Sequence, residues 1–189
     1  MSFPTNLDEF FKPQDVRKSV LHSQLLALEC QVRVIKALDV EHSFGVEGSV
    51  NAEFLLGHAR DLVSSAETIA QRAKHASRDS TLNSLRALRE TAAELTNRAR
   101  TLDKDALSRA KMRLDQCLAE HAGVTPDSVA GHVPADPQRL AVKAGVSCFR
   151  AEGEQFKTFA VQVEALCDLA LEFAYKSALE SPAFQSSKF

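Results

Sequence analysis

A stretch of 65 residues between Gly57 and Gly123 contains neither glycine nor proline. These two residue types punctuate most turn-rich folds, so their absence over such a length is typical of long helices. In and beside this stretch, apolar residues return at alternating steps of four and three, which places them on one helical face. The two resulting ladders are Leu55, Ala59, Leu62, Ala66, Ile69, Ala73 and Ala76, then Leu85, Leu88, Ala92, Leu95, Ala99 and Leu102. Because no strand pattern produces this spacing, the sequence predicts an all-α fold.

We expect a single domain over residues 1–189, folded as an antiparallel helical bundle of about five main helices. The predicted helices are 14–38, 49–77, 80–101, 103–122 and 138–181, with an N-terminal arm or short helix at 1–12 and a tail at 182–189. The boundary between the third and fourth helices depends only on a shift in the apolar spacing. One continuous helix with a local change of register is the alternative.

The first predicted helix has two apolar stripes, separated by about 100° around its axis. The main stripe is Leu21, Leu25, Leu28, Val32 and Ile35, and the second is Val20, Ala27, Val34 and Leu38. A helix with two apolar faces usually touches two neighbours, so we expect this helix to lie centrally in the bundle.

The last predicted helix carries the longest ladder and would be about 65 Å long. Its period of 3.5 residues predicts near-parallel packing of neighbouring helices. Because it is longer than its predicted partners, a terminal segment or a second copy of the chain must cover its projecting end. We expect a homodimer. The candidate interface comprises Val142, Val146, Phe149, Phe156, Phe159, Val163, Leu166 and Phe173.

Positive charge is concentrated in residues 72–113, where eleven Lys or Arg stand against five Asp or Glu. Arg78, Arg89 and Arg100 recur every eleven residues, which is three helical turns, and Arg86 lies beside them. We call these four residues the arginine ridge. An anionic partner would suit it, whether an acidic protein surface, nucleic-acid phosphates or an anionic lipid, although most such faces are simply solvated.

Aromatic residues are absent between Phe54 and Phe149, so the arginine ridge has no stacking platform for single-stranded nucleic acid. The net charge of −2 also argues against a protein that binds nucleic acid or membrane surfaces over its whole length. We therefore do not expect nucleic acid or peripheral membrane association, and we do expect a protein partner.

Four well-separated cysteines (Cys30, Cys117, Cys148 and Cys167) without a C-x-x-C pair are typical of reduced thiols in the cytoplasm. The N-terminus lacks a basic segment followed by an apolar run, and no apolar stretch approaches the roughly 18 residues of a membrane span. These features predict a cytoplasmic protein without a transmembrane segment.

Reactive side chains form no catalytic, metal-binding or nucleotide-binding signature in the sequence. The six histidines are scattered, without an H-x-x-x-H pair or the E-x-x-H spacing of a di-iron bundle. We therefore predict no catalytic residues, no metal and no cofactor.

Two resemblances supply alternatives to this prediction. Arg17 and His22 form an R-x-x-x-x-H spacing similar to that of the all-helical HEPN ribonucleases, in which an Arg and a His of paired subunits act on RNA phosphate. The alanine-rich amphipathic helices resemble those of phasins, which coat polyester granules. Our main expectation is a non-enzymatic interaction, adaptor or regulatory protein acting through helix faces. The alternatives are a lipid- or granule-surface binder, and a helical ribonuclease or nucleic-acid-binding protein.

Overall fold

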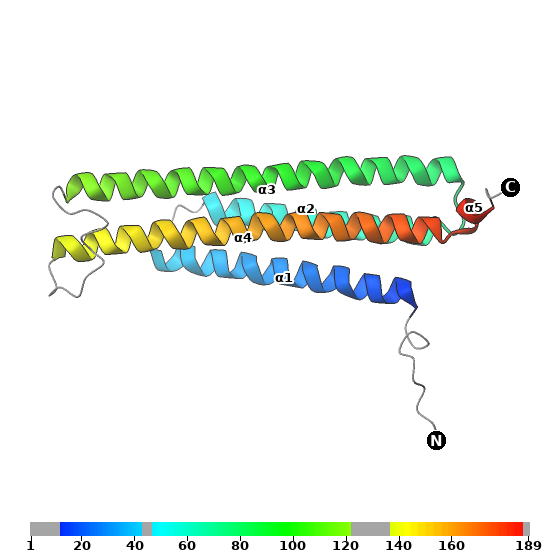
Figure 1. The fold of residues 1–189 in the computed structure, drawn as a ribbon, viewed down its shortest axis with the longest axis horizontal. Helices are drawn as coiled ribbons and strands as arrows, with labels where there is room; N and C mark the ends of the chain where they lie inside the picture. Colours follow the sequence, from blue (N-terminus) through cyan, green and yellow to red (C-terminus); the bar gives the residue numbers. More distant parts are fainter. Residues whose placement is uncertain (1–11, 43–46, 122–136, 187–189) are drawn as a thin grey trace, which may run out of the picture.

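The protein is an elongated antiparallel bundle of four long helices, which confirms the predicted all-α fold. The computed structural model describes residues 12–42, 47–121 and 137–186. The helices are α1 (Pro13–His42), α2 (Glu47–Arg72), α3 (Arg78–Glu120), α4 (Pro137–Leu179) and the single turn α5 (Pro182–Gln185). Each long helix runs opposite to the one before it, so that α1 and α3 begin at the end of the rod where α4 finishes (Figure 1).

The apolar ladders form one core that runs along the inside of the bundle. All six members of the ladder from Leu85 to Leu102 are buried, as are Leu55, Ala59, Leu62 and Ala66 on α2. The most extensive packing joins α3 to α4, while α1 rests on α4 and α2. Alanine is frequent on the buried faces of α2 and α3, and its small side chain allows helix axes to approach closely.

Residues 78–120 form one continuous helix, so the predicted division into 80–101 and 103–122 is wrong. The Thr101 hydroxyl donates to the Asn97 carbonyl at 3.0 Å, a bond made within the helix that does not interrupt it. The buried face continues from Leu102 to Ala106 rather than to Leu107, which is exposed. The change of apolar spacing is therefore a shift of register within α3.

The other predicted boundaries differ from the structure by a few residues. The predicted helices 14–38, 49–77 and 138–181 correspond to Pro13–His42, Glu47–Arg72 and Pro137–Leu179. Helix α2 ends before Ser77 because Ser77 is the N-cap of α3, where its side chain accepts from the Ser80 amide at 3.3 Å. The predicted tail begins instead with α5, since Pro182 suits the first turn of a helix. The predicted arm, apart from Lys12, and residues 187–189 lie outside the described residues.

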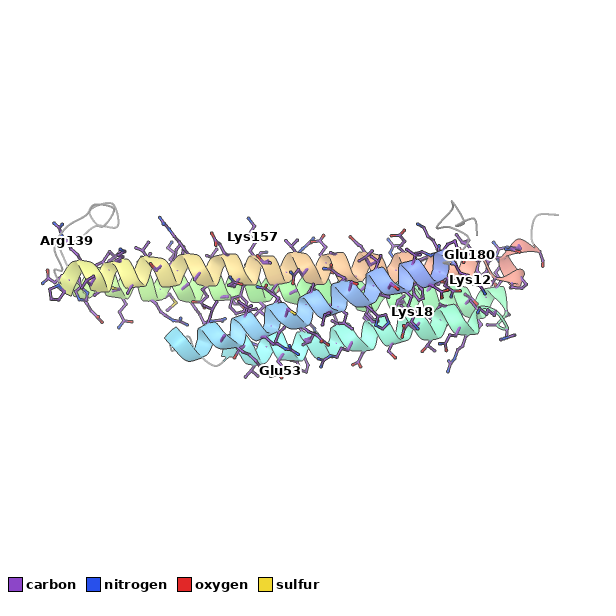
Figure 2. The ribbon with its side chains drawn as sticks, turned by 90° about the horizontal axis from the view of Figure 1, so that it is seen from below. Lys12, Lys18, Glu53, Arg139, Lys157 and Glu180 are labelled. Carbon is purple, nitrogen blue, oxygen red and sulfur yellow. The ribbon has the colours of Figure 1, made fainter. Side chains whose placement is uncertain are left out.

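Helices α3 and α4 are longer than α1 and α2, and their paired ends reach past the shorter helices (Figures 1 and 2). Each has 43 residues against 30 in α1 and 26 in α2, which corresponds to about 64 Å against about 45 and 39 Å. Gly48 lies in the first turn of α2, next to Phe156 of α4. A Cβ added there would lie 3.0 Å from the Phe156 ring, so glycine lets the first turn of α2 approach α4 closely.

Helix α1 touches two neighbours as expected, α2 and α4, but the central position is wrong, because α4 and not α1 packs against all the other long helices. Its main stripe is buried, with Leu21 and Leu28 fully enclosed. Its second stripe faces outwards, and the Val20 and Val34 side chains are exposed.

Candidate functional site

The candidate interface on α4 is largely occupied by the protein's own helices. Six of its eight residues are buried within the single chain, and only two keep partly exposed side chains, Val146 and Phe149. The six buried residues are Val142, Phe156, Phe159, Val163, Leu166 and Phe173. Both partly exposed residues precede Phe156, in the part of α4 that reaches beyond the first turn of α2.

The arginine ridge borders α4, and several of its members have partners there or nearby. The Arg100 guanidinium donates to Glu164 at 2.6 Å, and Arg78 lies over the Phe184 ring at 5.5 Å from its centroid. Arg86 donates to the Asn83 side chain of its own helix, over a longer distance of 3.4 Å.

Arg89 lines a cavity of about 310 Å³ between α3 and α4. Arg100, Glu164 and Asp168 also line this cavity, so two acidic groups accompany the two arginines. Cys167 forms part of the wall, and burial raises the pKa of its thiol, which stays protonated at neutral pH. The charges balance at this point of the ridge, which weakens the case for a polyanionic partner.

Arg17 and His22 do not converge on a common site. Arg17 pairs with Glu180 at the end of α4, whereas the His22 ring nitrogen Nε2 lies 2.7 Å from Glu67 Oε1 on α2. Five residues of helix separate the two side chains by about 140° around the axis, so each points to a different neighbour. Within one chain, the two residues of the R-x-x-x-x-H spacing therefore contact two different carboxylates, those of Glu180 and Glu67.

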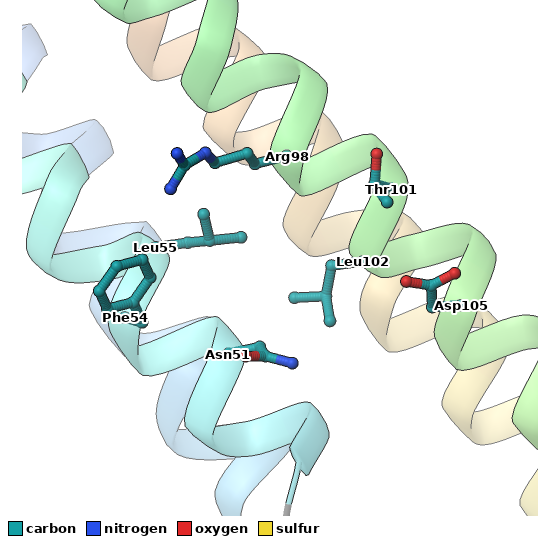
Figure 3. A pocket seen from close by; sticks show the side chains of 7 residues that line it. All are labelled: Asn51, Phe54, Leu55, Arg98, Thr101, Leu102 and Asp105. Atoms are coloured by element: carbon teal, nitrogen blue, oxygen red, sulfur yellow. The ribbon is translucent and has the colours of Figure 1, made fainter.

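A groove between α2 and α3 holds the most exposed aromatic side chain of the described residues. Figure 3 shows Leu55 on α2 and Leu102 on α3 pointing towards each other, with Phe54 standing at the edge. The cavity between these helices has a volume of about 280 Å³ and is lined by Asn51, Phe54, Leu55, Arg98, Thr101, Leu102 and Asp105. Phe54 is 58% exposed, and its ring meets His58 edge-on with 4.4 Å between ring centroids.

Opposite charges stand at the two ends of this groove. Arg98 crosses it from α3 and is held by Glu94 one turn earlier, at 2.5 Å. Asp105 lies seven residues further along α3, about 10 Å away along the helix axis. The groove therefore combines apolar walls with a basic and an acidic rim.

Sequence reasoning missed this groove, although one signal was present. Val50 and Phe54 are large apolar residues four apart on α2, and both lie outside the ladder that begins at Leu55. Both are exposed in the structure. The cavity itself depends on how α2 and α3 are placed together, which the periodicity of a single helix does not specify.

No group of three or more His, Cys, Asp or Glu within residues 12–42, 47–121 and 137–186 is arranged to hold a metal ion. In the same part of the chain, none of the helices combines the length and apolar character needed to cross a bilayer. Comparison of the chain with protein-family models, with curated proteins and with solved structures finds no match.

Proposed function

We propose that this chain is a non-enzymatic interaction protein, of the adaptor or regulatory kind, which binds an amphipathic helix of a partner protein in the groove between α2 and α3. The observation that carries this proposal is the exposed Phe54 ring beside a cavity walled by Leu55 and Leu102. The homodimeric state and the cytoplasmic location predicted from the sequence stay predictions.

An exposed aromatic side chain next to an apolar cavity has the character of a binding hot spot. A partner side chain that entered the cavity would remove the Phe54 ring from water, next to the Leu55 and Leu102 side chains that are already buried. Aromatic residues at the centre of an interface often contribute most of its binding free energy. The rest of the groove then needs only to exclude water.

The size and shape of the groove favour a helix over a small molecule. Pockets for small ligands usually enclose about 300–1,000 Å³, and 280 Å³ lies just below that range. An open groove between two helices instead suits an amphipathic helix with one bulky apolar anchor. A basic residue about two turns from that anchor would meet Asp105, and an acidic residue would meet Arg98.

Selection from a displayed library of amphipathic helical peptides, followed by fluorescence anisotropy, tests this proposal. We expect the selected peptides to share a bulky apolar anchor and to bind Phe54→Ala about thirtyfold more weakly than the unmodified protein. That factor corresponds to about 2 kcal/mol, a typical loss for an aromatic hot spot.

Val161→Ala is the matched control, because Val161 is also 58% exposed but lies on α4 and does not line the groove. Its affinity for the peptides should equal that of the unmodified protein. A library that yields no binding peptide would contradict the proposal. Equal binding to Phe54→Ala and the unmodified protein would contradict it as well.

A further inference from the structure

A second cavity follows the one beside Phe54 along the groove between α2 and α3. Its volume is about 50 Å³, and it is lined by His58, Thr91, Glu94, Leu95 and Arg98. Its α3 residues stand seven positions before those that line the first cavity, and Arg98 belongs to both sets. On α2, His58 likewise stands seven positions after Asn51 of the first cavity. The two cavities are therefore one heptad apart, about 10 Å along the helix axes.

The imidazole of His58 brings an unsatisfied polar atom to the second cavity. Its Nε2 atom is buried and has no hydrogen-bond partner among the described residues. The edge-on contact with the Phe54 ring, at 4.4 Å between centroids, orients the imidazole. A buried polar atom without a partner costs free energy, which is recovered when a ligand supplies the missing hydrogen bond. At about 10–15 Å³ for each non-hydrogen atom, the cavity has room for a polar group of three or four such atoms.

Hydrogen-bond donors predominate in the second cavity. Arg98 extends from α3 across the groove (Figure 3), and its bond to Glu94, at 2.5 Å, engages one of the five N–H groups of the guanidinium. The same contact neutralises the Glu94 charge. The Thr91 hydroxyl donates within α3, to the Ala87 carbonyl. A ligand for this cavity therefore has to accept hydrogen bonds, and a carboxylate is the strongest acceptor that a protein side chain offers.

We propose that the second cavity takes the carboxylate of an acidic residue on the partner helix, seven residues from the apolar anchor that enters the first cavity. This proposal rests on the proposed function and adds the chemistry and the register of a second contact. The carboxylate accepts hydrogen bonds from protonated Nε2 of His58 and from the Arg98 guanidinium. The Arg98 side chain is 49% exposed, so it is free to turn towards the incoming group and open the way to His58.

The spacing of seven residues follows from the geometry of both walls. Residues seven apart on a helix return to nearly the same face, about 10 Å apart along its axis. An anchor and an acidic residue at this spacing reach both cavities together when the partner helix lies along α3. Residues five apart point about 140° away from each other, so an acidic residue at that spacing leaves the second cavity empty.

Three peptides built on one selected anchor sequence test the second contact by fluorescence anisotropy. The first has glutamate seven residues from the anchor, the second has glutamine at that position, and the third has glutamate five residues away. Each is made with the polar residue before and after the anchor, because a helix can lie in the groove in either direction. In one direction, we expect the first peptide to bind about tenfold more tightly than the other two, which is typical of a charge-assisted hydrogen bond.

His58→Phe separates a direct contact from a change in structure. Phenylalanine retains a ring against Phe54 but removes both ring nitrogens, so the preference for glutamate over glutamine should fall to about twofold, the part that Arg98 supplies. A purely structural effect would weaken the glutamate and glutamine peptides equally. His75→Phe is the matched control, because His75 is exposed and lines neither cavity, and it should keep the full preference. Circular dichroism should show unchanged folding for both variants.

The outcomes separate this inference from the proposed function. Equal affinity for the glutamate and glutamine peptides in both directions, with Phe54→Ala still weakening both, would overturn the second contact and leave the proposed function intact. A preference for glutamate that His58→Phe leaves unchanged would overturn it as well. Peptides that bind Phe54→Ala as tightly as the unmodified protein would contradict the proposed function and this inference together.

Discussion

Replacing Phe159 with alanine tests whether the apolar face of α4 is the core of a single chain. Phe159 is 0% exposed and is the largest of the fully buried side chains. Truncation of a fully buried phenylalanine costs about 3–5 kcal/mol, since the transfer free energy of the ring is lost and a cavity remains. For a chain of this length, that cost lowers the melting temperature by roughly 6–20 °C.

Val161→Ala supplies the comparison two residues away on the same helix. Two residues turn the helix by about 200°, so that Val161 points outwards and is 58% exposed. Its truncation should change the free energy of unfolding by no more than about 0.5 kcal/mol. Urea unfolding followed by circular dichroism, with both variants at several protein concentrations, gives the two values.

A loss of less than about 1 kcal/mol for Phe159→Ala would refute the reasoning, because a ring with no exposed surface cannot be removed at so small a cost. A large loss seen only at high protein concentration would also refute it. That pattern would mean that the ring is buried between chains and not within one.

Two further predictions concern α2 and its contacts with α1. Gly57→Ala should raise the free energy of unfolding, measured by urea unfolding, by about 0.5–1 kcal/mol. An added Cβ at this position meets nothing within 4 Å, and alanine favours the helix more than glycine does. An unchanged free energy of unfolding would contradict this prediction. Burial raises the pKa of Glu67, but hydrogen bonds from His22 and Lys18 outweigh it and hold that pKa below 4.5. Ionised Glu67 therefore stabilises the folded state above about pH 4.5. Glu67→Gln should lower the free energy of unfolding by roughly 0.2–1 kcal/mol at pH 6. In unfolding experiments at a series of acidic pH values, the difference between Glu67→Gln and the unmodified protein should disappear as the pH falls through the lowered pKa of Glu67.

The helices and their buried faces could be predicted from the sequence because each depends on spacing within one segment. The ladder from Leu85 to Leu102 illustrates this, since all of its members are buried. The predicted break near Thr101 failed for a related reason. Local preferences of threonine and aspartate are worth only a few tenths of a kcal/mol, and the packing of Leu102 and Ala106 outweighs them.

The identity of the partner that covers each apolar face could not be predicted. The ladder on α4 and the second stripe on α1 have the same kind of spacing, but Val163 is buried by the protein's own helices while Val34 faces outwards. Periodicity reports that a face is apolar, not which surface meets it. The groove beside Phe54 was missed for the same reason, because it exists only once two helices are set side by side.

The unequal dimensions of the bundle affect how the protein moves through solution. A rod about 64 Å long has a radius of gyration of at least about 18 Å from its length alone, whereas a globular chain of 189 residues has about 16 Å. A single copy therefore diffuses more slowly than a sphere of equal mass. On a gel-filtration column calibrated with globular standards it elutes early, at the volume of a heavier protein. For this fold, the elution volume depends mainly on the length of the rod, so the number of chains has to be determined from a measurement of molar mass.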